Sequence, residues 1–220
     1  RYALLGTFAS GGIGPHELTL MPDGRTLVVA NGGIRTDPAL GREPLNTEQM
    51  QPSLAYIDTK TGTLIERVVL PGSLHKLSLR HLAVNTHGLV VIGCQHKGPR
   101  NETPGLVFTH AMGEEPQELS LPGNITRKLH NYVSSVALDR SGRYAAVTSS
   151  KGGAALILDT ERRQLEQMHL AADISGIAAS GNTPGSFIAT SGNGRVGAPA
   201  AMADPQGPKV SWDNHLLRVV

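Results

Sequence analysis

The chain has 220 residues, of which 39% are hydrophobic and 17% charged, with a formal net charge of +2. This composition excludes an intrinsically disordered chain, and no apolar run approaches the roughly 20 residues of a membrane span. The basic residues are scattered and only 4% of the residues are aromatic, so we expect no nucleic-acid partner and no base-stacking surface.

In chain order, the sequence predicts pairs of strands joined by tight turns, in repeated copies. Residues 16–33, 81–94 and 135–149 align with one another, and a weaker fourth copy covers residues 176–179 and 185–191. The turn is Asp23-Gly24 in the first copy and Ser141-Gly142 in the third, and both pairs are typical of β-hairpins. The 26 glycines and 14 prolines of the chain agree with many turns.

Each full copy is followed by a second pair of strands. These pairs cover residues 54–58 with 64–70, 106–109 with 117–121, and 155–159 with 164–170, and the only helical stretch is residues 126–130. Units of four antiparallel strands, repeated at intervals of roughly 40 to 65 residues, indicate an all-β chain of the β-propeller class. A β-sandwich is the alternative fold.

The number of blades predicts an incomplete ring. We count a leading strand at residues 2–8, three full blades, and a fourth blade that lacks its outermost strand unless residues 216–219 supply it. Because a propeller closes with about 4 to 8 blades, we expect about three and a half blades of a probable seven. Residues 1–220 are then the C-terminal part of one propeller domain, and N-terminal blades absent from this chain or a second copy close the ring.

The polar residues that stand out fall into one class of loops. In a propeller, the loops before the first strand and after the second strand of each blade meet at one end of the central channel, where we predict a ligand-binding site. The candidates near the first strands are His16, Glu17, Arg80, His81, Asn131, Tyr132 and Ser135. Those near the second strands are Asn31, Gln95, His96 and Asn193, and a last group contains Asp213 and His215.

The chemistry of these candidates is open. His16 and Glu17 cannot both face the channel from a regular strand, because successive residues point to opposite faces. The first-strand histidines either form hydrogen bonds to neighbouring blades or, as His16, His81, His96 and His215, form a metal site. Arg80 is either an anion clamp or part of an ion pair between blades. No catalytic constellation, metal or cofactor can be identified from the sequence.

Several motifs resemble a known bacterial family. They are Gly-Ile-Gly-Pro-His-Glu at residues 12–17 and the segments 23–34, 50–54, 77–82, 93–95, 131–137 and 212–216. The chain resembles the family numbered fifteen-thirteen among the domains of unknown function. The resemblance implies an exported, periplasmic seven-bladed propeller related to the quinoprotein amine dehydrogenase β-chain, with about three further blades before residue 1. Ser175 departs from the family pattern, which has a cysteine there.

The resemblance also implies a biological setting. Members of this family are encoded beside imelysin-type iron-uptake lipoproteins and a di-haem oxidase, so iron-uptake proteins are the expected partners. We therefore expect a periplasmic binding or scaffold protein associated with iron acquisition. The alternative is a metal-dependent, lactonase-like hydrolase or an oxidoreductase subunit that acts at the channel mouth, because propellers host both kinds of function.

Overall fold

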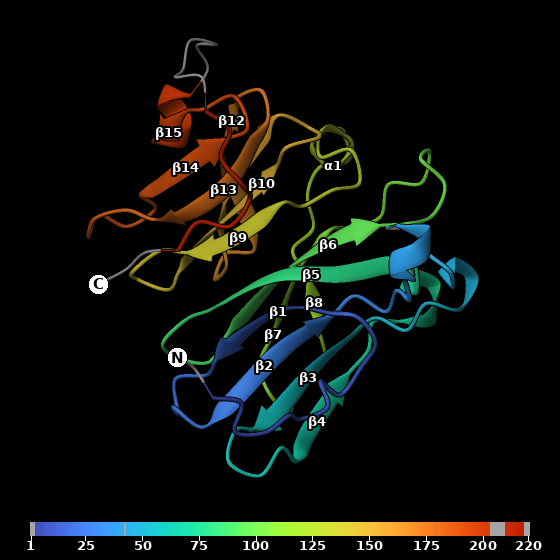
Figure 1. Ribbon diagram of the computed structural model, residues 1–220. Helices are drawn as coiled ribbons and strands as arrows, with labels where there is room; N and C mark the ends of the chain where they lie inside the picture. Colours follow the sequence, from blue (N-terminus) through green and yellow to red (C-terminus); the bar gives the residue numbers. More distant parts are fainter. Residues whose placement is uncertain (1–2, 42, 203–209, 218–220) are drawn as a thin grey trace.

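The chain folds into four antiparallel sheets that follow one another in an arc (Figure 1). The computed structural model describes residues 3–41, 43–202 and 210–217. Blade 1 contains β1 (Pro15–Leu20), β2 (Thr26–Asn31), β3 (Ser53–Asp58) and β4 (Leu64–Val68), and blade 2 contains β5 (Leu77–Val84), β6 (Val90–His96), β7 (Val107–His110) and β8 (Gln117–Glu118). Blade 3 contains β9 (Ser135–Leu138), β10 (Tyr144–Ser149), β11 (Ala154–Asp159) and β12 (Gln164–Leu170), and blade 4 contains β13 (Ile174–Ala179), β14 (Phe187–Ser191) and β15 (Val196–Gly197).

Within every sheet the strands pair in sequence order, as in a meander. The innermost strands also contact one another in order, β1 with β5, β5 with β9, and β9 with β13. This radial arrangement is that of a β-propeller and excludes the sandwich. Three blades have the predicted four strands, and in the fourth the short β15 supplies a third strand.

The hairpin turns have the expected backbone geometry. Gly24 has a φ of 65° and Gly142 a φ of 73°, in the left-handed region that glycine adopts readily. The Asp23 carboxylate accepts hydrogen bonds from the backbone nitrogens of Arg25 and Thr26 at 2.8 Å each. These turns therefore follow from the local sequence alone.

The predicted leading strand is wrong. Residues 3–10 form no strand, and the side chains of Leu4 and Leu5 are 84% and 99% exposed. A strand needs a neighbour to accept and donate its backbone hydrogen bonds, and residues 3–10 form no backbone–backbone hydrogen bond among the described residues. Leu216 and Leu217 likewise belong to no strand, whereas residue 2 and residues 218–219 of the two predicted segments lie outside the described residues.

The predicted helix at residues 126–130 is displaced. Helix α1 covers Gly123–Lys128, directly after Pro122. It ends there because His130 and Asn131 both have positive φ angles, 48° and 58°. Among the described residues no helix is long and apolar enough to cross a membrane.

The core lies between the blades. All residues of β3 and β11 are buried. Blades 2 and 4 pack on the two faces of β11, whereas β3 packs on blade 2 through Leu54 and Tyr56 and is covered on its other face by the segment around Gly11. One apolar cluster joins blades 1, 2 and 3, and a second joins blades 3 and 4. This stacking fixes the inner strands relative to one another and so fixes the end of the axis where their polar residues meet.

Candidate functional site

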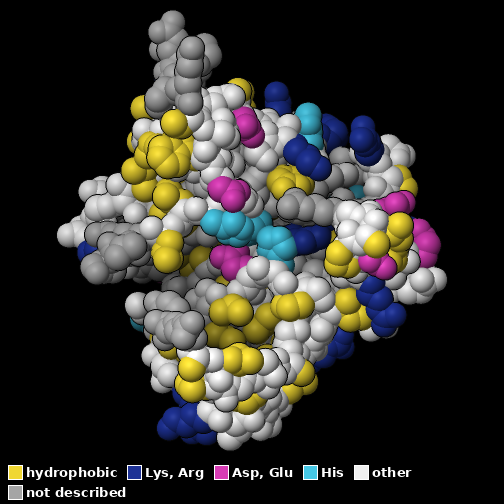
Figure 2. Space-filling model, in the orientation of Figure 1, with side chains coloured by type: hydrophobic (Ala, Val, Ile, Leu, Met, Phe, Trp, Pro, Cys, Tyr) yellow, Lys and Arg dark blue, Asp and Glu magenta, His cyan; other side chains and the backbone are white. Residues whose placement is uncertain are grey.

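A polar cavity of about 710 Å³ opens where the inner strands converge. Figure 2 shows histidine side chains at the centre of this face, with basic and acidic side chains beside them. The cavity is lined by residues of all four blades and of the C-terminal segment: His16, Ile34, Thr36, Pro44, Arg80, Lys97, Tyr132, Ser150, Asp173, Ser175, Gly192, Ser211, Trp212, Asp213, Asn214 and His215. We call it the central pocket.

Irregular strand pairing turns three of these side chains toward the central pocket. The register of β1 shifts between Pro15 and Glu17, that of β5 between Leu79 and His81, and that of β13 between Ile174 and Ile177. The skipped positions include His16, Arg80 and Ser175, all of which line the central pocket. A bulge re-aims a side chain that a regular strand would point elsewhere, so equivalent bulges in three blades build one site.

Three histidine side chains cluster at the central pocket, where His16 and His215 line the wall and His81 lies behind it. The ring centroids of His16 and His81 are 4.8 Å apart, those of His81 and His215 5.5 Å, and those of His16 and His215 6.5 Å. Burial, followed by the nearby His81 and Arg80, lowers the pKa of His16 to about 4, so this ring is neutral at pH 7. The predicted convergence of His16, Arg80, His81 and Tyr132 at one end of the axis is confirmed.

His81 is held by a neighbouring blade. Its Nδ1 lies 2.9 Å from Oε2 of Glu17, whereas its Nε2 has no partner among the described atoms. Glu17 thus faces blade 2, while the bulge at His16 turns that side chain toward the central pocket. The interpretation of the first-strand histidines as hydrogen-bonding partners between blades fits His81.

The four-histidine metal site is not formed by the described residues. His96 lies outside the central pocket, where its Nε2 contacts Glu102 Oε2 at 3.2 Å. Within residues 3–41, 43–202 and 210–217, no group of three or more His, Cys, Asp or Glu side chains has the arrangement of a metal centre. The structure therefore carries no argument for a metal-dependent reaction at this site.

Two basic side chains, those of Arg80 and Lys97, line the central pocket. Arg80 is partly buried, and its Nε has no hydrogen-bond partner in the described part of the chain. Lys97 donates from Nζ to Oε1 of Gln95 at 2.9 Å. Burial, Arg80 and Lys151 lower the pKa of Lys97 to about 8. No described carboxylate forms an ion pair with either residue, so the interpretation of Arg80 as part of an inter-blade ion pair is wrong for the described residues.

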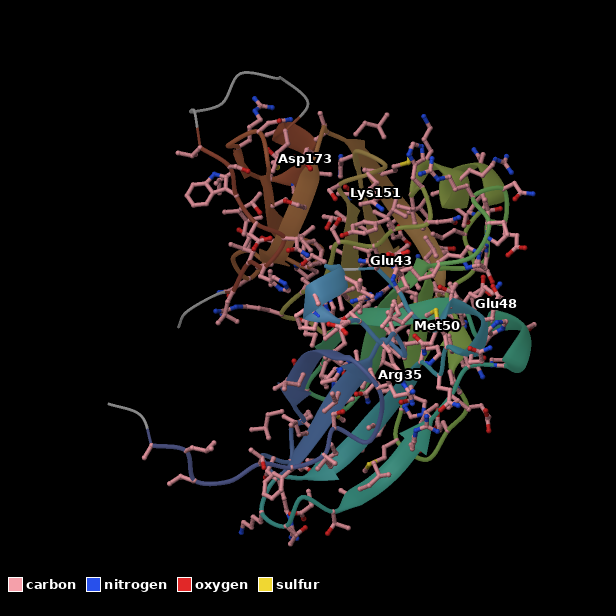
Figure 3. The ribbon with its side chains drawn as sticks, turned by 45° about the vertical axis from the view of Figure 1, so that its right-hand side comes forward. Arg35, Glu43, Glu48, Met50, Lys151 and Asp173 are labelled. Atoms are coloured by element: carbon pink, nitrogen blue, oxygen red, sulfur yellow. The ribbon has the colours of Figure 1, made fainter. Side chains whose placement is uncertain are left out.

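The C-terminal segment supplies further lining residues of the central pocket. The Thr190 hydroxyl donates to the backbone oxygen of Asp213 at 3.2 Å, and Asn214 Nδ2 donates to the backbone oxygen of Ser134 at 3.0 Å. Asp173 adds a second carboxylate to the lining. Figure 3 shows Asp173 and Lys151 on the blades that lie across from Arg35 and Glu43, which belong to the long β2–β3 loop.

The remaining predicted residues do not line the central pocket. Asn31, Gln95 and Ser135 are buried near strand ends, where Asn31 Nδ2 donates to the backbone oxygen of Ser10 at 3.0 Å. Asn193 is exposed and donates to the backbone oxygen of Ala172. His96 and Asn131 instead line a neighbouring cavity. Glu17 and His81 lie behind the pocket wall.

The list of sequence candidates omitted several lining residues: Lys97, Ser150, Asp173, Ser175, Trp212 and Asn214. Lys97 and Ser150 follow the second strands of blades 2 and 3, so they lie in the same class of loops as His96 and were left out only in the choice among loop residues. No feature of the sequence marks Asp173 as a lining residue. Its position depends on the turn between β12 and β13, where it has a φ of 54°. Blade topology thus identified the loops that line the central pocket, but the sequence did not show which residues of those loops line it.

Comparison with known proteins supports this fold. The family model described as "Protein of unknown function (DUF1513)" matches residues 1–219. No curated protein matches the chain. The chain is similar to the structure of U3-55K, with a TM-score of 0.59 and 12% identity over 84% of this chain and 48% of that one.

Two further solved structures are similar. Hydrazine synthase of Kuenenia stuttgartiensis has a TM-score of 0.58 and 18% identity over 81% of this chain and 56% of that one. The Cps50 (Swd1) β-propeller domain of Myceliophteria thermophila has a TM-score of 0.51 and 12% identity over 80% of this chain and 47% of that one. The chain thus spans about half the length of these structures, and such low identities show the fold alone.

Proposed function

The chain belongs to this family of proteins of unknown function, and from the geometry of its central pocket we propose that it is a binding protein for a small anionic ligand. The observation that carries the proposal is Arg80, a partly buried guanidinium whose Nε has no partner among the described atoms. A buried cation without a counter-charge is costly, and buried charges are normally paired. An anionic group of a ligand would supply the missing partner.

The neighbourhood of Arg80 favours an anion further. Burial lowers the pKa of Arg80 below its usual range, yet a guanidinium remains charged at neutral pH. Lys97 adds a second positive charge on the same wall, and the two cations repel each other. An anion between them relieves this repulsion, and a planar guanidinium fits carboxylate, sulfate or phosphate oxygens with two parallel hydrogen bonds.

The other lining residues of the central pocket indicate which chemical groups the rest of the ligand should have. Asp173 and Asp213 offer acceptors, and Ser150, Ser175 and Asn214 can both donate and accept. A ligand with hydroxyl groups beside its anionic group matches this lining. The described lining residues support binding and include no nucleophile that is hydrogen-bonded to a base, so a binding role is favoured over the hydrolase or oxidoreductase alternative.

We also propose that further blades complete the ring. Leu18 and Leu20 of β1 are 58% and 50% exposed, and Leu64 and Ile65 of β4 are 45% and 50% exposed. Apolar side chains at this spacing on a sheet face are normally covered by the next blade. About three N-terminal blades of the same protein are the proposed cover, with a second copy as the alternative.

The biological setting belongs to the same proposal. The family resemblance supports a periplasmic location and partners among iron-uptake proteins. In that setting the protein would hold an anionic small molecule, or present it to a partner, at the polar end of the propeller. The geometry of the central pocket supports the anion, whereas only the resemblance supports iron acquisition.

The experiment uses sulfate as the probe and Trp212 as the reporter. Trp212 is the one tryptophan of the sequence and it lines the central pocket, so its fluorescence reports events there. We expect saturable binding of sulfate that weakens at least about tenfold in Arg80→Met, since a charge-assisted hydrogen bond contributes about 1.5 to 3 kcal/mol. Arg140→Met is the matched control, because Arg140 lies at the hairpin turn of blade 3 and contacts Asn182. Equal sulfate affinities in the wild type and in Arg80→Met would contradict the proposal.

A further inference from the structure

A second cavity, of about 770 Å³, lies beside the central pocket. Lys97 and Tyr132 line both cavities, so the two share a wall. The second cavity is formed by the loop after β6, by α1 and the segment that follows it, and by Lys151 in the turn between β10 and β11. None of its residues belongs to blades 1 or 4, so it is a separate compartment of the same polar end.

The lining of the second cavity is strongly cationic. It includes the basic residues Lys97, Arg100, Arg127 and Lys151, together with His96 and His130, and no acidic residue is among the described residues that line it. The carboxylate of Glu102, which is not among the lining residues, contacts His96 Nε2 through Oε2 at 3.2 Å. The second cavity therefore has a positive charge that its own residues do not compensate.

Two details indicate that a ligand group completes the second cavity. The His96 side chain is only 6% exposed, and its Nδ1 has no partner in the described part of the chain. Buried polar atoms are normally hydrogen-bonded. His130 and Asn131 hold consecutive left-handed backbone conformations, and such costly conformations cluster at binding sites.

The shared wall connects the two compartments. Lys151 Nζ lies 4.4 Å from the ring centroid of Tyr132. Lys97 is near enough to both Arg80 and Lys151 that their charges lower its pKa. Positive charge thus continues from Arg80 through Lys97 to Lys151. One small monoanion at Arg80 would leave the second cluster without a partner.

We propose that one elongated ligand with an anionic group at each end spans both cavities, with one end at Arg80 and the other among Arg100, Arg127 and His96. This inference rests on the proposed anion site in the central pocket and specifies the ligand class as a dianion. Joining two anionic groups makes the second contact intramolecular, which strengthens binding only when the spacer matches the distance between the sites.

The test compares linear dicarboxylates from succinate to sebacate with monocarboxylates of the same carbon number, by Trp212 fluorescence at pH 7. At one spacer length we expect the dicarboxylate to bind at least about tenfold more tightly than its monocarboxylate, with one ligand per protein. Arg127→Met should remove this advantage and change the monocarboxylate affinity less than about twofold. Arg100→Met is the second variant, and Arg140→Met is the control outside both cavities.

The outcomes separate this inference from the proposed function. If monocarboxylates bind in an Arg80-dependent way but no dicarboxylate gains affinity, the anion site stands and the bridging ligand is wrong. A gain that persists in both Arg127→Met and Arg100→Met also overturns the inference. If binding of the monocarboxylates does not depend on Arg80, the proposed function itself fails.

Discussion

His81 and Glu17 are hydrogen-bonded across the boundary between blades 1 and 2, with Nδ1 of the imidazole 2.9 Å from Oε2 of the carboxylate. The His81 side chain is 2% exposed and the Glu17 side chain 29% exposed. The contact joins the two innermost strands β1 and β5, directly behind the wall of the central pocket. It therefore couples the stacking of the blades to the position of the histidine cluster.

Removal of the Glu17 carboxylate should destabilise the fold. Glu17→Ala leaves Nδ1 of the buried His81 without its partner, so we expect the free energy of unfolding to fall by roughly 1 to 3 kcal/mol. Glu17→Gln keeps an acceptor oxygen and should cost less than about half as much. Urea unfolding of the three proteins measures this, and an Ala variant as stable as the wild type would show that the pair contributes nothing.

The blade pattern was predictable from sequence because it depends on local features. Strand alternation and turns such as Asp23-Gly24 act over a few residues, and the three full blades follow from them. The absence of the leading strand was not predictable, because residues 2–8 have strand-like composition and the deciding factor is whether the segment forms backbone hydrogen bonds with another strand. Composition cannot report such a partner.

The site was only partly predictable. The loop rule placed His16, Arg80, Tyr132, Asp213 and His215 together, because it depends on blade topology. The pairing of Glu17 with His81 spans 64 residues and depends on how two blades stack. The bulges that turn His16 and Arg80 toward the central pocket have no clear sequence signal.

Gly24 provides a test of the hairpin face. Its φ of 65° is unfavourable for residues with a Cβ, although no heavy atom lies within 4 Å of the position that a Cβ would take. Gly24→Val should therefore lower the free energy of unfolding by roughly 1 to 2 kcal/mol through backbone strain alone. Sulfate affinity should not change, because the turn lies at the opposite end of β1 and β2 from the central pocket.

The matched control for this substitution is Gly72→Val. Gly72 also has open space around its Cβ position, but its φ is not positive. If backbone strain causes the loss at Gly24, the free energy of unfolding should fall clearly less in Gly72→Val than in Gly24→Val. Equal losses at Gly24 and Gly72 in thermal unfolding would show that flexibility, not the left-handed conformation, sets the cost.

Lys97 should make sulfate binding depend on pH. Its pKa is about 8, lowered by burial and by the nearby Arg80 and Lys151. The protonated amine binds the anion, so the affinity should be constant below about pH 7 and fall as the pH rises from 8 to 10. Sulfate stays doubly charged throughout this window, so the change reports the protein.

The control for this pH dependence is Lys97→Met. The variant should bind sulfate weakly at pH 7 and lose the decline above pH 8, because no titrating amine remains at the pocket wall. Trp212 fluorescence titrations between pH 6.5 and 10 provide the measurement. An unchanged decline in the variant would assign the pH dependence to another group.

The exposed apolar face of blade 1 should drive association of residues 1–220 on their own. At about 25 cal/mol per Å², several hundred Å² of sheet face left in water corresponds to roughly 10 kcal/mol, which is comparable with the stability of a whole domain. We expect sedimentation to show species larger than a monomer. Leu18→Glu with Leu20→Glu should shift them toward the monomer. A folded wild-type monomer with one cooperative thermal transition would refute the incomplete-ring account.

The central claim is that Arg80 and Lys97 hold an anionic group, and the most direct measurement is anomalous diffraction from crystals soaked in selenate. Selenate has the shape and charge of sulfate, and its selenium marks its position. The account predicts an anomalous peak in the central pocket, with selenate oxygens within about 3 Å of the Arg80 guanidinium, and no such peak in crystals of Arg80→Met. Selenate bound only elsewhere on the protein, or an unchanged peak in the variant, would contradict it.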